Sequence, residues 1–193
     1  KDAQNIFQEN KLVGNITIAA SKTISNYIMP NIYFDFLTKY KDVKLDILTI
    51  NSSKIIDKIL KSEIDIGLIE INTQNSSLIK EKLCDDELIV VTSDKNYKKE
   101  AFIDAIKKRW ILREIGSGTR EIFINYIGDI SKELDIFMQL QDFEEIKTIV
   151  LNNPDTVTTL SKVIVKKELE ENKLFQIKLK NINLQREFYL IYH

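Results

Sequence analysis

The sequence of 193 residues predicts an α/β protein made of two lobes, each following a strand–helix–strand–helix–strand (βαβαβ) plan. Short runs rich in β-branched residues alternate with segments whose apolar residues recur at helical spacing. This alternation is typical of parallel sheets with right-handed helical crossovers. The same order starts again after a charged loop at 93–100, and hydroxyl-rich turns follow strands in both halves. Ligands of such sheets bind beyond the carboxyl ends of the strands, so these turns are the first candidates for a site.

The first lobe is expected to hold its polar groups at the ends of its strands. Ser21 and Thr23 stand between the first strand and the first helix, and Asn51 follows the second strand. Pro30 lies inside the first helix and predicts a kink or an irregular first turn. The expected segments are strands at 15–20, 44–50, 64–70 and 87–92 and helices at 24–40 and 53–60.

The second lobe is expected to repeat the plan of the first. A final strand at 186–192 is a candidate to return to the first lobe. The segments between the charged loop and this strand are helices at 101–108, 119–127, 144–151 and 161–171 and strands at 110–112, 135–141, 156–160 and 175–179.

One turn of the second lobe has the pattern of an anion-binding site. An apolar strand ends at Leu112, the segment Gly116-Ser-Gly-Thr119 breaks it, and a helical pattern starts at Arg120. A turn of this kind leaves backbone N–H groups unpaired beside the positive end of a helix dipole, where anions and polar molecules bind. Two of the five glycines of the chain, Gly116 and Gly118, lie here.

Composition excludes several classes of protein. The formal net charge of −1 argues against non-specific nucleic-acid binding, and no window has the roughly 18 apolar residues of a membrane span. The first ten residues lack the pattern of a signal peptide, and the single Cys84 favours a reducing compartment, so we expect a cytoplasmic protein. The only histidine is the terminal His193, which leaves no histidine-based catalytic group or metal-ligand set inside the fold. We therefore expect no enzyme, no metal and no cofactor.

Each candidate binding residue also has a purely structural interpretation. Ser and Thr before a helix usually cap it, but hydroxyl turns at equivalent places in two lobes favour a shared ligand. Glu114 either forms a surface ion pair with an arginine or accepts hydrogen bonds from a ligand, and the sequence favours neither. Gln141 ends a strand at the position that matches Asn51. Its side chain either faces a ligand or is solvated, and the sequence favours neither. Trp110 is expected in the core.

Several motifs, in order and spacing, resemble the effector-binding domain of LysR-type transcriptional regulators. The resemblance covers nearly everything from Gly14 to Tyr192. The segments that carry it are 14–21 (GNITIAAS), 23–30 (TISNYIMP), 65–69 (DIGLI), 86–91 (DELIVV), 112–120 (LREIGSGTR), 145–150 (EIKTIV) and 160–161 (LS).

The resemblance implies two Rossmann-like lobes joined by crossover strands, as in type II periplasmic binding proteins, with a small molecule in the cleft between them. Lobe one would be 14–92 plus 183–193, lobe two 93–182, and 1–13 the end of a linker helix. The segment 24–40 would form part of a dimer interface. The resemblance also implies that the full-length protein is a tetramer and that it contacts DNA through a helix-turn-helix domain, which is absent from this sequence. We expect eight ligand-binding residues, which come from the family resemblance, the matching strand ends and the glycine turn. They are Ser21, Thr23, Asn51, Glu114, Ser117, Gly118, Thr119 and Gln141.

The resemblance has departures, and it leaves the ligand open. The family usually has a glycine-rich turn where this chain has 152–156 (NNPDT), which puts in doubt a ligand contact carried over to that loop. The branch that regulates sulfur and cysteine metabolism is the most similar, so sulfate, sulfite or a small amino-acid derivative are the candidate effectors. An extracytoplasmic solute-binding protein of a transporter is the alternative function, and an enzyme with the same lobes is a weaker third. An upstream helix-turn-helix would support the regulator, and a signal peptide the solute-binding protein.

Overall fold

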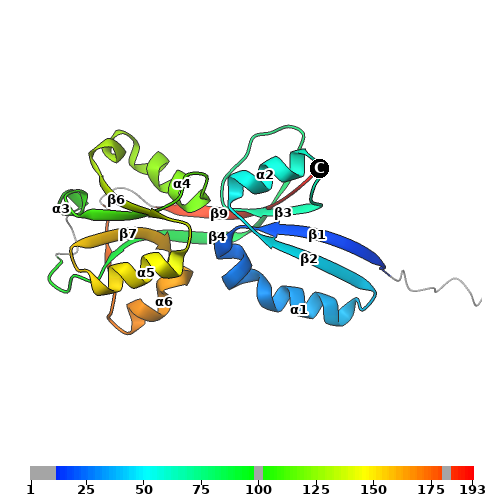
Figure 1. Cartoon of the computed structure of the whole chain (residues 1–193), viewed down its shortest axis with the longest axis horizontal. Coiled ribbons are helices and arrows are strands. Elements are labelled where there is room, and N and C mark those ends of the chain that lie inside the picture. Colours follow the sequence, from blue (N-terminus) through cyan, green and yellow to red (C-terminus); the bar gives the residue numbers. More distant parts are fainter. Residues whose placement is uncertain (1–11, 98–101, 180–183) are drawn as a thin grey trace, which may run out of the picture.

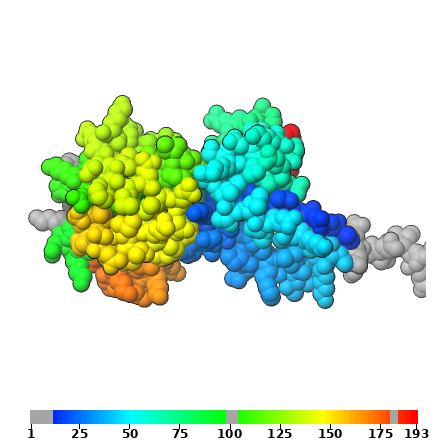
Figure 2. Space-filling model, in the orientation of Figure 1, coloured from blue at the N-terminus to red at the C-terminus, as the bar shows by residue number. Residues whose placement is uncertain are grey.

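The computed structural model describes residues 12–97, 102–179 and 184–193, and these form two lobes side by side, joined by two long strands (Figure 1). Figure 2 shows the two halves meeting across a narrow waist. Among the described residues, no helix is both long and apolar enough to cross a membrane. The expected segment 1–13 lies almost wholly outside the described residues, as do positions 98–101 and 180–183.

The first lobe is a parallel sheet with helices on both faces. Its strands lie in the order β2-β1-β3, and Ile18 of β1 pairs with Ile47 of β2 and Ile66 of β3. Ile24 and Met29 pack on one face of the sheet, and Ile55 and Ile59 of α2 pack on the other. The elements are β1 (Gly14–Ala20), β2 (Val43–Thr49), β3 (Ile66–Ile69), η1 (Ile24–Ile28), α1 (Met29–Lys39) and α2 (Ser52–Leu60).

The first helix begins irregularly, as Pro30 predicts. Residues Ile24–Ile28 form a π-helix, and the α-helix α1 starts only at Met29, with Pro30 in its first turn. Proline has no N–H to give to the carbonyl of Asn26, four positions earlier, so regular α-helical bonding cannot run through this point. Tyr27 lies in this π-helical segment and contacts the other lobe, as described below.

The second lobe repeats the first in strand order and direction. Its sheet runs β6-β5-β7, all parallel, which matches β2-β1-β3. Trp110 is fully buried, stacks on Phe123 with ring centroids 5.1 Å apart and donates its indole N–H to the carbonyl of Ala105. The expected core position of Trp110 is confirmed. The elements are α3 (Phe102–Ile106), β5 (Arg109–Arg113), α4 (Gly118–Ile127), η2 (Gly128–Glu133), β6 (Asp135–Leu140), α5 (Phe143–Asn152), β7 (Thr156–Ser161), α6 (Lys162–Glu170) and β8 (Phe175–Ile177).

Two strands cross between the lobes. The expected strand 87–92 is only the second half of β4 (Ile79–Thr92): this half pairs with β7 and β8, and the first half pairs with β9. The strand β9 (Gln185–Tyr192) pairs with β3 through Tyr189–Ile191, so the expected return to the first lobe is confirmed. Residues 79–86 were not expected as strand because most of their side chains are charged and they lack a continuous apolar run. The other element ends agree with the expected ones to within two residues.

Candidate ligand-binding site

A buried carboxylate occupies the junction of the two lobes. Glu70 follows β3 directly and is 2% exposed. Its Oε1 accepts a hydrogen bond of 2.7 Å from the Ser21 hydroxyl, at the end of β1. Its Oε2 accepts bonds of 3.0 Å from the Thr119 hydroxyl, in the first turn of α4, and 2.9 Å from Arg186 Nη1, on β9. Donors from both lobes and from a crossover strand therefore meet at one side chain.

Arg186 extends this arrangement into the second lobe. Its guanidinium, nearly inaccessible to solvent, lies 4.9 Å from the centroid of the Phe188 ring. Its Nε donates a bond of 2.6 Å to Asp86, and the other oxygen of Asp86 accepts one of 2.6 Å from the Ser161 hydroxyl at the end of β7. We call the residues Ser21, Glu70, Asp86, Thr119, Ser161 and Arg186 the Glu70 network.

The Glu70 carboxyl group is ionised at neutral pH. Burial alone would raise its pKa, but the Arg186 guanidinium and the Ser21 hydroxyl stabilise the anion and hold the pKa below its usual value. Thr23 also lowers this pKa, although its buried Oγ1 makes no hydrogen bond of ordinary geometry among the described residues. A buried charge is tolerated at this depth only because paired groups surround it.

The glycine turn of the second lobe packs directly on the first lobe. A β-carbon at Gly118 would lie 2.6 Å from the Glu70 β-carbon and 3.1 Å from the Ser52 hydroxyl, so only glycine fits. Gly116 has a φ of +85°, which favours glycine, and its carbonyl accepts a bond of 3.3 Å from the Ser53 backbone N–H. The two glycines thus allow the N-terminus of α4 to approach the first lobe closely.

Glu114 contacts an arginine and the first lobe. Arg113 holds its carboxylate in two hydrogen bonds of 2.8 and 3.1 Å, and Asn51 Nδ2 donates to it at 3.4 Å. The Asn51 side-chain oxygen simultaneously caps α2 by accepting from the Lys54 N–H. Glu114 therefore forms an ion pair with an arginine, but the pair is largely buried and not at the surface as expected. The cross-lobe amide contact comes in addition to it.

A second set of contacts joins the lobes at the start of α5. The Tyr27 hydroxyl donates a bond of 2.9 Å to Glu144, and its ring packs against Phe143 with centroids 5.6 Å apart. Burial and the Glu144 carboxylate raise the pKa of Tyr27, so the phenol remains protonated. Gln141, the expected counterpart of Asn51, is exposed at the end of β6 and does not join the Glu70 network.

The structure brings together part of the predicted site. Ser21, Gly118 and Thr119 surround Glu70, and Asn51 and Glu114 pair beside them. Ser117 and Thr23 occupy N-cap positions, yet neither side chain caps its helix. The alternative that these two hydroxyls serve only as caps is therefore wrong. Both side chains are buried, each two positions from a hydroxyl that donates to Glu70.

Sequence reasoning missed the acidic and basic centre of the site. Glu70 ends the third apolar strand, at the same sheet edge as Ser21 and Asn51, and this position was the available signal. Arg186 opens the last apolar strand, but nothing in its local sequence indicates burial. Asp86 begins the segment 86–91, which resembles the family, but the local sequence does not indicate that Asp86 pairs with Arg186.

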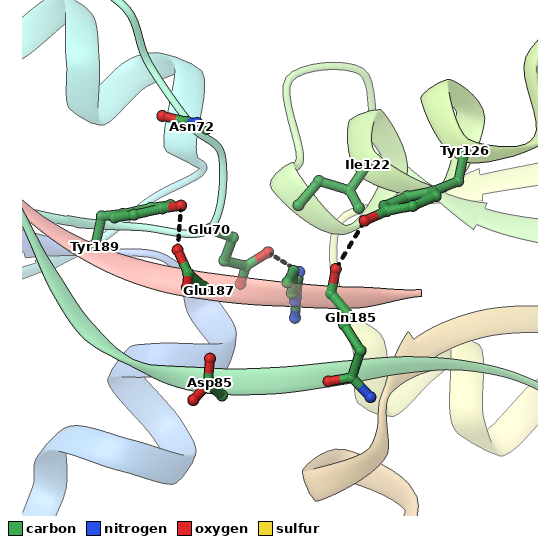
Figure 3. A pocket seen from close by; sticks show the side chains of 9 residues that line it. Glu70, Asn72, Asp85, Ile122, Tyr126, Gln185, Glu187 and Tyr189 are labelled. Atoms are coloured by element: carbon green, nitrogen blue, oxygen red, sulfur yellow. Dashed lines mark hydrogen bonds and ion pairs between the residues drawn. The ribbon is translucent and has the colours of Figure 1, made fainter. Parts of the chain in front are cut away.

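A cavity of about 430 Å³ borders Glu70 and Arg186 on one side of β9. Figure 3 shows Ile122 and Tyr126 of α4 facing it from one lobe, with Asn72 and Tyr189 across from them. The Tyr126 hydroxyl donates to the Gln185 carbonyl, and Tyr189 donates to Glu187. No group of three metal-ligating side chains occurs in the described part of the chain.

Two similar lobes, two crossover strands and a polar centre at their junction define a binding domain with the architecture of type II periplasmic binding proteins. The family model of the LysR substrate binding domain matches residues 9–193, so the chain belongs to this family. It is the effector domain of a LysR-type transcriptional regulator, and the family is not one of enzymes.

One curated relative is similar over the whole chain, and two solved structures share its fold. The HTH-type transcriptional regulator YeiE of Escherichia coli strain K12 is 29% identical over 195 residues, covering 100% of this chain and 66% of the relative; the chain thus spans just under two thirds of that protein. The effector-binding domain of QuiR in complex with shikimate matches with a TM-score of 0.79 at 16% identity, over 94% of this chain and 88% of that one. A putative phosphate ABC transporter substrate-binding protein of Clostridium perfringens, with bound phosphate, matches with a TM-score of 0.76 at 19% identity, over 93% and 86%.

Proposed function

We propose that this domain senses a small polar or anionic molecule bound between its two lobes, and that binding changes the geometry of the oligomer to control transcription. The observation that carries this proposal is the convergence of Ser21 and Thr119, from different lobes, on one anionic group. A ligand that engages both hydroxyls stabilises one relative orientation of the lobes. Such differential binding is what a population shift requires.

The chemistry of the junction supports a ligand that accepts hydrogen bonds. Shikimate and phosphate, named with two structures of the same fold, both carry negatively charged oxygens. Sulfate, sulfite and a small amino-acid derivative are the candidates for this chain. The contact residues that we propose are Ser21, Thr23, Asn51, Glu114, Ser117, Gly118, Thr119 and Gln141. We add Arg186 to this proposal because its guanidinium donates to Glu70 at the lobe junction.

The output of the domain would pass through a dimer. Exposed apolar side chains on α1, Ile32 at 47% and Phe34 at 71%, give this helix an unpartnered surface that a second copy could cover. The full-length protein would be a cytoplasmic tetramer that contacts DNA through an upstream helix-turn-helix domain. Membership of the regulator family favours this role over a solute-binding protein. We also propose lobe boundaries at 14–92 plus 183–193 and 93–182, with 1–13 as the end of a linker helix.

Calorimetric titration tests the proposal. We expect sulfate, sulfite or a small amino-acid derivative to bind the wild-type chain, and Ser117→Ala and Ser21→Ala each to weaken that binding about tenfold, the effect of one lost hydrogen bond to a charged group. Ser77→Ala, an exposed hydroxyl in the loop before β4, is the matched control and should bind as the wild type does. If none of the three ligand classes binds the wild-type chain, the proposed ligand class is wrong.

A further inference from the structure

Two buried hydrogen-bond donors at the Glu70 network are left unused by its carboxylates. Ser21, Thr119 and Arg186 Nη1 already use both oxygens of Glu70. Arg186 Nη2 is buried and has no partner among the described residues, and Thr23 Oγ1 is buried without a hydrogen bond of ordinary geometry. Buried donors without partners are costly, and native proteins contain few of them. This surplus fits an acceptor with more than two oxygens.

The charges at the junction also disfavour the presence of the Glu70 carboxylate and an added anion at the same time. Arg186 already faces two carboxylates, Glu70 at 2.9 Å and Asp86 at 2.6 Å. A third negative group at this buried position would face strong repulsion at low local dielectric. An oxyanion can therefore take the Ser21 and Thr119 donors only if the Glu70 carboxylate withdraws.

A cavity beside Glu70 can accommodate its carboxylate when it leaves the Ser21 and Thr119 donors. The cavity of about 430 Å³ that borders Glu70 is lined by several polar side chains, among them Asn72 and Gln185, together with apolar surface of residues such as Ile122. Figure 3 shows Glu70 among the residues that line it. The acidic lining residues Asp85 and Glu187 share one partner, Lys82, at 2.7 Å from each, so one of their two negative charges is compensated there. A carboxylate that rotates toward this side would be hydrated.

Building on the proposed function, we propose that Glu70 is an internal competitor of the effector: its carboxylate occupies the donors that an oxyanion ligand takes over on binding. Glu70 thereby sets both affinity and selectivity. It weakens binding of every anion by the cost of its own displacement, and it disfavours simple anions that cannot use the spare Arg186 and Thr23 donors. The same exchange breaks the Glu70 contact between β3 and α4 and replaces it with a ligand contact, which links occupancy to lobe orientation.

The experiment is a calorimetric titration of inorganic sulfate, a probe with four acceptor oxygens, into this chain and three variants. Glu70→Gln removes the competing charge while keeping the side-chain shape, and we expect it to bind sulfate at least about tenfold more tightly, the value of one charge-assisted hydrogen bond. Glu63→Gln removes the same charge from the exposed partner of Lys58 and should bind sulfate as the wild type does. Glu70→Asp keeps the charge but withdraws it by one methylene group, so its affinity should lie between wild type and Glu70→Gln.

Each outcome decides the proposal. A folded Glu70→Gln variant that binds sulfate no better than the wild type overturns the competitor role, and so does tighter binding in Glu63→Gln of the same size. If Glu70→Gln does not fold, Glu70→Asp is used for the test. A Glu70→Asp variant that binds sulfate no more tightly than the wild type then overturns the competitor role. Failure of sulfate to bind both wild type and Glu70→Gln also overturns it. The proposed sensing function fails separately, only if sulfite and the amino-acid derivatives also do not bind.

Discussion

Gly118 lies so close to Glu70 that a β-carbon at position 118 would come within 2.6 Å of the Glu70 β-carbon. This approach places the first turn of α4, in one lobe, against the end of β3, in the other. It is also what brings the Thr119 hydroxyl to 3.0 Å from the Glu70 carboxylate. A glycine that looked like part of an anion-binding turn therefore has a packing role between lobes as well.

Gly118→Ala is expected to force the lobes apart at this contact. Overpacking of a tight site costs about 1 to 3 kcal/mol, and the shift would lengthen the Thr119–Glu70 hydrogen bond. We expect a lower free energy of unfolding in urea and weaker effector binding by calorimetry. Gly128→Ala is the control: its φ of +56° makes alanine strained, but a β-carbon there meets only open space. It should lose stability without losing ligand affinity, and equal losses of affinity in both variants would contradict the role of Gly118.

Tyr27→Phe tests the second contact between the lobes. The change removes the hydrogen bond to Glu144 and keeps the ring against Phe143. Loss of one hydrogen bond to a charged acceptor lowers the free energy of unfolding by at most about 3 kcal/mol. Glu144 is exposed to solvent, so we expect a smaller loss here. Small-angle scattering should report a larger radius of gyration of the ligand-free chain. Tyr192→Phe, which removes a similar bond to Glu81 between the neighbouring strands β9 and β4, should leave the scattering unchanged.

The stability contributed by Glu70 should depend on pH. Its pKa is lower in the folded chain than the unfolded value of about 4.3, so the unfolded chain binds more protons as the pH falls through this range. The contribution is fully present above about pH 5 and is lost as the pH falls toward the folded pKa. Urea unfolding of wild type and Glu70→Gln between about pH 3 and pH 7 measures it. The stability difference between the two proteins should grow from about pH 3 to pH 5 and then level off; a difference that is constant over the whole range would contradict an ionised Glu70.

Phe34→Glu tests the dimer surface on α1. Phe34 is 71% exposed, and a charge placed at the centre of an apolar interface is strongly unfavourable. We expect sedimentation velocity to show more than a monomer for the wild type and a shift to monomer for the variant. Ile79→Glu, at an exposed apolar position on β4, is the matched control and should sediment as the wild type does. A wild-type chain that stays monomeric at high concentration would count against a dimer of this domain.

The sequence by itself determined the type and order of the elements and the place of the hydroxyl turns, because both follow from local patterns. Apolar residues at helical or strand spacing are read within a dozen positions, and Ser21, Asn51 and Thr119 stand where strands meet helices. Pro30 likewise predicted an irregular helix start from its own chemistry, the missing N–H.

Only the tertiary structure decided which groups meet at the junction. Glu70 and Arg186 are 116 positions apart, and their pairing depends on β9 returning beside β3. The first half of β4 is a strand because β9 provides its hydrogen bonds, and its own side chains are largely charged and exposed. The turn with Ser117 and Thr119 was expected to hold an anion, and the structure shows that Thr119 already holds one, supplied by the chain itself. A buried charge is stable only where distant segments bring its partners together, and no local pattern records that.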